Sequence, residues 1–189
     1  ISILGTTGIV EPMSRAALID TIKLELGQKK AMGIKRVIIS PGNLGCGFLA
    51  EKYGFDPDKI VKCSNFIGVT VDLVCELGFE GMLVTGDIGK LIKVAGGIMN
   101  THSHEADARM EILAACSIKA GADAKVAGRI LDCTNTKEAL GILDDAGLLK
   151  SAMNIALERI LFLEHQKRLS QAVFCIPINS AFWPDLITF

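Results

Sequence analysis

The chain has 189 residues, of which 50% are apolar, so it is long enough to bury a substantial core and suits one domain. Twenty basic residues against 21 acidic ones leave a net charge of −1 without a polybasic face, which argues against nucleic acid or an anionic membrane as the main partner. No apolar run approaches the roughly 20 residues that a membrane span requires.

Six cysteines are spread along the chain and never form a CxxC or CxxH pattern. This favours reduced, buried thiols in a cytoplasmic protein over a zinc site or a disulfide framework. We expect no signal peptide before the first apolar segment. Because the chain begins on Ile1, inside that segment, we expect it to be a piece of a longer protein.

Apolar, β-branched runs alternate with helical patterns along the chain, as βαβ units require. They predict an α/β fold over residues 1–189, a single domain with a mostly parallel, twisted sheet and helices on both faces in a Rossmann-like layering. The runs that predict strands are residues 1–4, 36–40, 59–63, 81–85, 124–130 and 172–176.

A helix is predicted between the first two of these strands. Ser14 is a suitable N-cap, and Gly33 ends the pattern. Leu18, Ile22 and Leu26 recur at four-residue steps and should form the buried face.

Polar turns follow four of the predicted strands, and in a parallel sheet such turns gather at the edge where ligands bind. The Gly5–Gly8 turn either grips a ligand or is an ordinary strand exit. Pro41–Gly47 contains three glycines, as in loops that admit a nucleoside or phosphate, but it is not GxGxxG and no Walker lysine follows. Ser64–Asn65 either contacts a ligand or caps the next helix. Thr85–Lys90 is the fourth turn.

A further helix is predicted over about residues 103–120, where His104, Asp107 and Glu111 would share one face. A metal site on that face competes with a solvated polar stripe, which we prefer because no further histidine or cysteine has suitable spacing. His102 and His104 are better suited to hydrogen bonding and proton transfer near neutral pH, or to capping this helix.

Six motifs follow one another in the first two-thirds of the chain: ILGTTGIVEPMS (3–14), PGN (41–43), CSNFIG (63–68), IGK (88–90), NTHS (100–103) and ADARME (106–111). Together they resemble the cobalt-precorrin-5B C1-methyltransferase family of anaerobic cobalamin biosynthesis. The resemblance covers about residues 2–120 and fades beyond Gly121. Asp87 stands where the family usually has a histidine, and the family's amino-terminal portion is absent.

The resemblance implies transfer of a methyl group from the cofactor S-adenosylmethionine to a ring carbon of a cobalt-containing tetrapyrrole. His102 is our candidate for a base that adjusts protonation of the ring, and Glu111 is the second. Lys90, Lys93, Thr101, His104 and Arg109 are the expected substrate-binding residues, since the macrocycle carries many carboxylates. The expected cofactor-binding residues are Thr6, Thr7, Gly8, Gly42, Asn43, Gly45 and Asn65.

Two other functions stay open. One is a nucleotide- or dinucleotide-binding α/β domain of a redox enzyme, against which the missing GxGxxG counts. The other is a non-catalytic protein that carries a corrinoid intermediate. We expect no resident metal and neither nucleic acid nor a membrane as partner, and the sequence leaves a homo-oligomer open.

Overall fold

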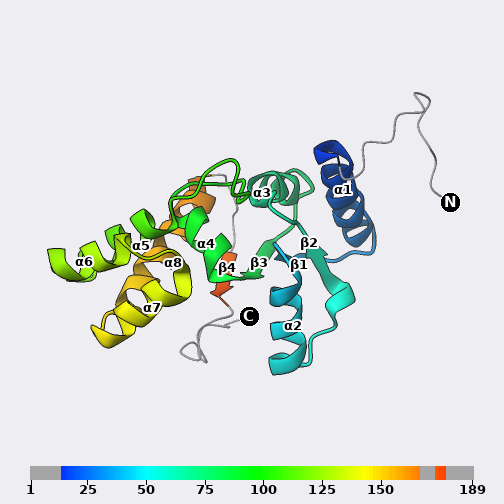
Figure 1. Cartoon of the computed structure of the whole chain (residues 1–189). Coiled ribbons are helices and arrows are strands. Elements are labelled where there is room, and N and C mark those ends of the chain that lie inside the picture. The colour runs from blue at the N-terminus through cyan, green and yellow to red at the C-terminus, as the bar shows by residue number, and fades with distance from the viewer. Residues whose placement is uncertain (1–13, 167–172, 178–189) are drawn as a thin grey trace.

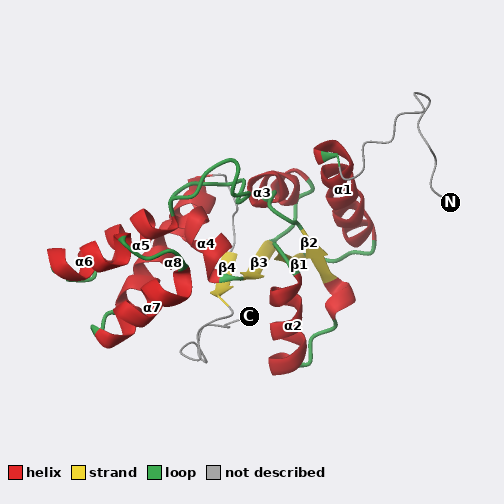
Figure 2. Ribbon diagram, in the orientation of Figure 1, coloured by secondary structure: helices red, strands yellow, loops and turns green. Residues whose placement is uncertain are grey.

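The structure is a computed structural model that describes residues 14–166 and 173–177. At its centre is a four-stranded parallel sheet with the strand order β2-β1-β3-β4 (Figure 2). The strands are β1 (Arg36–Ser40), β2 (Ile60–Lys62), β3 (Gly81–Gly86) and β4 (Val173–Pro177). Each lies close to a predicted strand, so the predicted α/β fold with a parallel sheet is confirmed.

The predictions for the first residues of the chain lie outside the described residues. They are the strand at residues 1–4 and the Gly5–Gly8 turn with Thr6, Thr7 and Gly8.

The central strand β1 is buried on both faces. Val37 and Ile39 belong to the main hydrophobic core, whereas Ile38 packs on the opposite side with Cys46 and Leu49. Because both faces are covered, the sequence of this strand is a continuous apolar run and does not alternate between apolar and polar residues.

The two faces of the sheet are covered by different helices, as predicted. Helices α1 (Arg15–Ala31) and α3 (Ile67–Glu76) pack together over one face, and α2 (Asn43–Tyr53) covers the other (Figure 1). A short 3-10 helix, Pro57–Lys59, leads from α2 into β2.

Helix α1 has the bounds and the buried face that the sequence predicts. The Ser14 hydroxyl accepts a hydrogen bond from the amide of Ala17 at 3.1 Å. Ile22 and Leu26 are buried beneath the helix. Gly33 follows the helix with a φ of +78°, a conformation that favours glycine.

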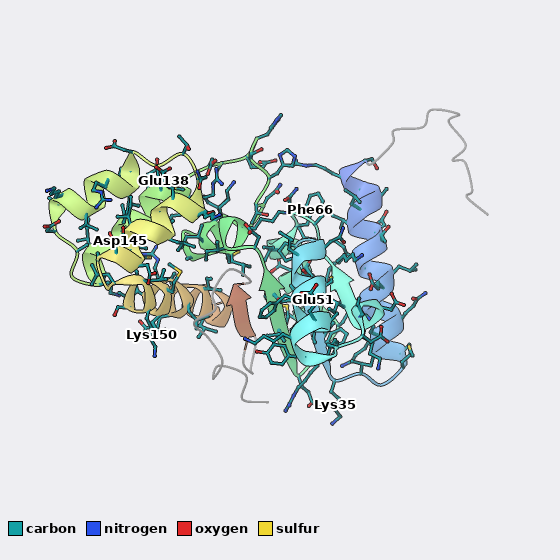
Figure 3. All side chains as sticks on the ribbon, turned by 60° about the horizontal axis from the view of Figure 1, so that its bottom comes forward. Lys35, Glu51, Phe66, Glu138, Asp145 and Lys150 are labelled. Atoms are coloured by element: carbon teal, nitrogen blue, oxygen red, sulfur yellow. The ribbon has the colours of Figure 1, made fainter. Side chains whose placement is uncertain are left out.

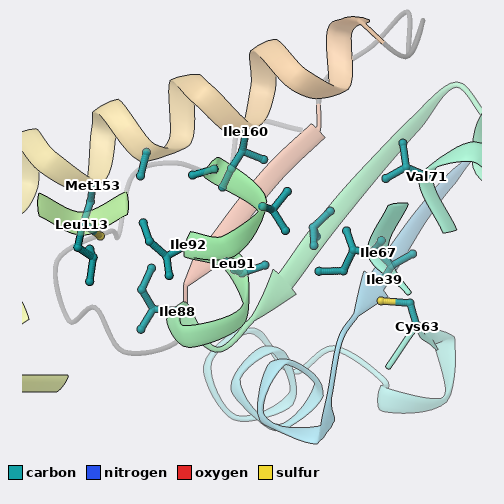
Figure 4. Close-up of a cluster of buried hydrophobic side chains, with 14 of the residues drawn as sticks. Ile39, Cys63, Ile67, Val71, Ile88, Leu91, Ile92, Leu113, Met153 and Ile160 are labelled. Carbon is teal, nitrogen blue, oxygen red and sulfur yellow. The ribbon is translucent and has the colours of Figure 1, made fainter. Parts of the chain in front are cut away.

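A second group of helices lies on the β4 side of the sheet (Figure 1). Helix α5 packs against α6, α7 and α8, while α4 and α8 contact β4. Figure 4 shows Ile88, Leu91 and Ile92 of α4 in one buried cluster with Leu113 and Met153. The helices of this group are α4 (Ile88–Ala95), α5 (Arg109–Lys119), α6 (Ala124–Leu131), α7 (Thr136–Asp145) and α8 (Leu149–Gln166).

The prediction of a strand at residues 124–130 is wrong, because this segment is helix α6. The Asp123 carboxylate caps the helix by accepting from the amide of Val126 at 2.8 Å. Ala127 and Ile130 are its buried residues, three positions apart. That spacing fits one side of a helix, whereas a half-buried strand would bury every second residue.

The predicted helix over residues 103–120 begins later than expected. Helix α5 starts at Arg109, and residues 101–108 form a loop with a turn at 103–105. His104 and Asp107 therefore do not share a helix face with Glu111.

The described cysteine side chains carry no disulfide. Cys46, Cys63, Cys116 and Cys133 are buried and Cys75 is half-buried, all as free thiols, which agrees with the predicted use of these residues in the core. Within residues 14–166 and 173–177, no helix combines the length and the apolar character needed to cross a bilayer.

Candidate functional site

The strand order reverses direction between β1 and β3. The chain passes from β1 through α2 to β2, and then crosses back through α3 to β3 on the other side of β1. In an open α/β sheet this switch point, at the carboxyl ends of the strands, is the usual place for a ligand. The turns at residues 41–42 and 86–87, which we call the switch turns, meet there.

The first switch turn is tightly packed against β3. Ser40 Oγ donates a hydrogen bond to the carbonyl of Gly42 at 2.6 Å. Gly45, in the first turn of α2, is buried. A Cβ atom at that position would lie 2.3 Å from Ser40 Oγ and 2.5 Å from the carbonyl oxygen of Thr85. Gly45 therefore lets α2 approach the strands, while Asn43 is exposed.

The two switch turns also contact each other directly. A Cβ atom on Gly86 would lie 2.6 Å from Cγ of Pro41, so the two residues are in close contact. The Lys90 ammonium donates to the carbonyl of Pro41 at 2.6 Å. Burial lowers the pKa of Lys90, although the nearby Asp87 carboxylate opposes this shift.

The thiol of Cys63 is not a nucleophile at neutral pH. It is fully buried, and burial raises the pKa of Cys63 to about 12. Only the thiolate is strongly nucleophilic, so this residue serves the core.

Asn65 joins the end of β2 to the loop at residues 99–108, which we call the 99–108 loop. The amide of Thr101 donates to the backbone carbonyl of Asn65 at 3.0 Å, and the Thr101 hydroxyl lies 3.3 Å from Asn65 Oδ1. The amide of Gly68 donates to the carbonyl of Met99 at 3.0 Å. Asn65 and Thr101, predicted to bind cofactor and substrate respectively, are thus neighbours.

The buried side chain of Lys93 also positions the 99–108 loop. Its Nζ donates to the carbonyls of Ala106 at 2.9 Å and Thr101 at 3.3 Å. Asp107 lies 3.9 Å away. The sequence predicts that Lys93 binds a substrate carboxylate, but its ammonium is engaged in positioning the loop. This contact explains why residues 101–108 do not extend α5.

The two predicted histidines are exposed on the 99–108 loop. Their rings are 5.0 Å apart in an edge-on arrangement. The amide of His104 donates to Nδ1 of His102 at 3.2 Å, and the amide of His102 donates to Asn100 Oδ1 at 3.2 Å. Because Nδ1 accepts a hydrogen bond, the neutral ring of His102 carries its proton on Nε2. His102 therefore presents a donor outward.

Arg109 forms a two-pronged ion pair at the end of this loop. Its Nε and Nη2 donate to the two oxygens of Asp107, each at 2.7 Å. The hydrogen bonds from Arg109 lower the pKa of Asp107.

The two remaining acidic candidates lie near the starts of helices. Asp87 accepts from the amide of Gly89 at 2.7 Å and so caps α4. Glu111 is exposed in the first turn of α5.

An open cleft lies beside this loop, between α1 and α3. We call it the α1–α3 cleft; its volume is about 350 Å³. It is at the carboxyl end of the sheet, as the position of Phe66 opposite Lys35 shows in Figure 3. The residues lining it are Arg15, Ile19, Phe66, Gly68, Val69, Asp72, Met99 and Asn100.

The structure thus sorts the predicted site residues into two groups. Gly42, Asn43, Gly45 and Lys90 belong to the switch point. Asn65, Lys93, Thr101, His102, His104 and Arg109 belong to the 99–108 loop or its supports. No group of three potential metal ligands among His, Cys, Asp and Glu occurs within the described part of the chain.

The residues of the α1–α3 cleft were not predicted from the sequence. Phe66 and Gly68 lie in the CSNFIG motif directly after Asn65, so that motif could have indicated them as site residues. Arg15 directly follows Ser14, the N-cap of α1, so its place in the first turn of that helix could be predicted. The contribution of Asp72 and Met99 depends on tertiary packing.

Comparison with known proteins gives a consistent answer. Residues 100–171 match the family described as CbiD, C-terminal domain. A protein named cobalt-precorrin-5B C(1)-methyltransferase from Thermoanaerobacter sp. (strain X514) is 49% identical over 148 residues, which are 78% of this chain and 40% of that protein. The protein of that name from Ruminiclostridium cellulolyticum is 47% identical over 163 residues, 86% of this chain and 42% of its own length.

A more distant relative of the same name, from Methanocaldococcus jannaschii, is 39% identical over 179 residues, 95% of this chain and 49% of that protein. The chain therefore spans less than half the length of the curated relatives it matches. No solved structure matches it. The predicted resemblance is confirmed, but it does not fade beyond Gly121, since the family match runs to residue 171.

Proposed function

We propose that this chain, which belongs to the cobalt-precorrin-5B C(1)-methyltransferase family, is part of an enzyme that transfers the methyl group of S-adenosylmethionine to C-1 of cobalt-precorrin-5B. The observation that carries the proposal is the 49% identity to a relative of that name over 78% of the chain. The reaction would belong to anaerobic cobalamin biosynthesis in the cytoplasm. The chain would act as one α/β domain of a longer protein.

The geometry supports this proposal because methyl transfer needs positioning more than a covalent nucleophile. S-adenosylmethionine, when bound, supplies a methyl group already activated by its sulfonium sulfur. Alignment of two reactants contributes about 7–11 kcal/mol to lowering a barrier. The fixed 99–108 loop and the turn after β2 offer such alignment, whereas the thiol of Cys63 is buried and protonated.

Polar groups at the carboxyl edge suit a substrate rich in carboxylates. His102 presents its Nε2–H outward, and His104 is exposed beside it. Arg109 is half-buried and keeps its charge paired with Asp107, so it offers its remaining donors. Lys90 is the fourth residue of this group, and its ammonium donates to the carbonyl of Pro41 at 2.6 Å. For the group that adjusts protonation of the ring, His102 remains our first candidate and Glu111 the second.

The direct test is to incubate the full-length protein with S-adenosylmethionine and cobalt-precorrin-5B and to measure both products by mass spectrometry. We expect one added methyl group on the macrocycle and one equivalent of S-adenosylhomocysteine. Binding of the macrocycle without turnover would favour a carrier instead. A melting temperature raised by NAD but not by S-adenosylhomocysteine would favour a redox enzyme.

Replacing His102 by Ala should lower kcat about 100-fold or more, as loss of a proton-transfer group does. The melting temperature should change little, because the side chain is exposed. Ser103→Ala, at the exposed neighbouring position, is the control and should keep its activity. Methyl transfer that is equally fast in the His102 variant would remove this residue from the mechanism.

A further inference from the structure

The walls of the α1–α3 cleft are two helices and a loop held by hydrogen bonds. Helix α1 contributes Arg15 and Ile19, four positions apart, and α3 contributes Gly68 and Asp72 at the same spacing, so each helix offers one face to the cleft. The third wall is the start of the 99–108 loop. Hydrogen bonds fix that wall to the end of β2 and the first turn of α3.

Gly68 brings the loop and α3 together. A Cβ atom there would lie 2.6 Å from Cβ of Met99, so only glycine permits this approach. The cleft is therefore bounded by segments that hold one another in place, and it needs no rearrangement to accept a ligand.

The size of the cleft limits what it can hold. Ligand pockets usually measure about 300–1,000 Å³. At about 350 Å³ the α1–α3 cleft is at the lower end of this range, so it suits a nucleoside and could enclose only part of a tetrapyrrole.

Its lining offers the contacts that a nucleoside requires. Ile19, Phe66, Val69 and Met99 supply apolar surface for a flat heteroaromatic ring. The Asn100 amide can both donate and accept, as the edge of a purine demands. Asp72 supplies a carboxylate, which accepts hydrogen bonds from a pair of ribose hydroxyls.

Charge distinguishes between the candidate occupants. Arg15 is the cation in the lining, and it is paired with Glu105 just outside the cleft. A ligand rich in phosphates or carboxylates would therefore have to compete with Glu105 for this guanidinium. The sulfonium and ammonium groups of the methyl donor need no cation in the lining.

We infer that the α1–α3 cleft binds the adenosine part of the methyl donor. This inference rests on the proposed function and deepens it, because it places the donor at the end of β2, next to Asn65, and not at the glycine turn after β1. The adenine ring lies against the apolar wall, the ribose hydroxyls donate to Asp72, and the reactive end of the donor extends toward the 99–108 loop.

The first experiment fills the cleft of the full-length protein. Val69→Phe adds volume within the cleft, and S-adenosylhomocysteine should bind at least tenfold more weakly by calorimetry. Leu24→Phe is the control, because Leu24 is an exposed residue of α1 outside the lining of the cleft, and its affinity should stay within about threefold of the unmodified protein. Melting temperatures show whether both variants fold.

The second experiment changes charge without changing shape. Asp72→Asn should weaken binding of adenosine about tenfold, because the ribose hydroxyls would then donate to a neutral amide oxygen instead of a charged carboxylate. The same variant should bind adenosine monophosphate relatively better, since a repulsion is removed. This variant keeps the test decisive if Val69→Phe does not fold.

The results distinguish a failure of the proposed function from a failure of the inference about the cleft. If the unmodified protein does not bind S-adenosylhomocysteine, the proposed function fails. If it binds S-adenosylhomocysteine but Val69→Phe and Asp72→Asn bind it equally well, the donor lies elsewhere and only the inference about this cleft is overturned. Weak binding confined to these two variants supports the cleft.

Discussion

The switch point between β1 and β3 and the end of β2 lie at the same edge of one sheet, yet they differ in what occupies them. At the switch point, Gly45 packs on β3, Gly86 contacts Pro41, and Lys90 bridges the two turns. At the end of β2, the 99–108 loop and the helices α1 and α3 leave an open cleft. Topology thus indicates the edge, but packing decides where on that edge a ligand has room.

The largest effect should come from breaking the packing of the switch point. Gly45→Ala places a Cβ atom within 2.3 Å of Ser40 Oγ, so we expect a loss of about 2–3 kcal/mol in the free energy of unfolding in urea. Gly47→Ala is the matched control two residues further along α2, where no atom lies within 4 Å. It should gain about 0.5–1 kcal/mol, because alanine favours a helix. Equal stabilities for the two variants would show that the switch point is not tightly packed.

A smaller loss should follow from releasing the 99–108 loop. Lys93→Met leaves the carbonyls of Thr101 and Ala106 without their buried donor, which should cost about 2 kcal/mol of unfolding free energy. The exposed Lys125 in α6 gives a control, because Lys125→Met should stay within about 0.5 kcal/mol. Hydrogen exchange of residues 100–108 should accelerate in the first variant. Unchanged exchange there would contradict the role assigned to Lys93.

The smallest effect concerns the ion pair at the end of the loop. Arg109→Gln should lower stability by less than about 1 kcal/mol, since the Asp107 carboxylate is partly exposed. The pKa of Asp107 is lowered in the folded protein, so its contribution is complete above the ordinary value of 3.8 and is lost as the pH falls through the lower folded value. The stability difference between the two proteins should therefore be constant near neutral pH and shrink below about pH 4.

Unfolding curves at several pH values, with Arg109→Lys alongside, check this prediction. Lysine keeps the charge but not the two-pronged geometry, so its effect should be intermediate. A stability difference that grows as the pH falls would contradict the assigned pKa direction.

The elements that could be predicted from the sequence are those whose determinants are local. The β-branched run at residues 36–40 and the Ser14 and Gly33 boundaries of α1 lead directly to β1 and α1. The segment 124–130 was misassigned because a short apolar run fits a strand as well as a helix, and burial of Ala127 and Ile130 against other helices decided it.

Parts of the site depended on contacts between distant segments and were not predictable from local patterns. The start of α5 is delayed by Lys93, which lies 13 residues before Ala106 in the sequence. The α1–α3 cleft requires the approach of Met99 to Gly68, over thirty positions away. By contrast, Asn65 and Thr101 were predicted as site residues from separate motifs, and the structure brings them together.

The most direct test of the central claim is peptide-level hydrogen exchange of the full-length protein with and without saturating S-adenosylhomocysteine. We expect slower exchange in residues 65–72 and 98–101, which border the α1–α3 cleft, and no change in residues 42–47. Protection confined to residues 42–47 would mean that the donor occupies the switch point, and would contradict the claim that it binds in the α1–α3 cleft at the end of β2.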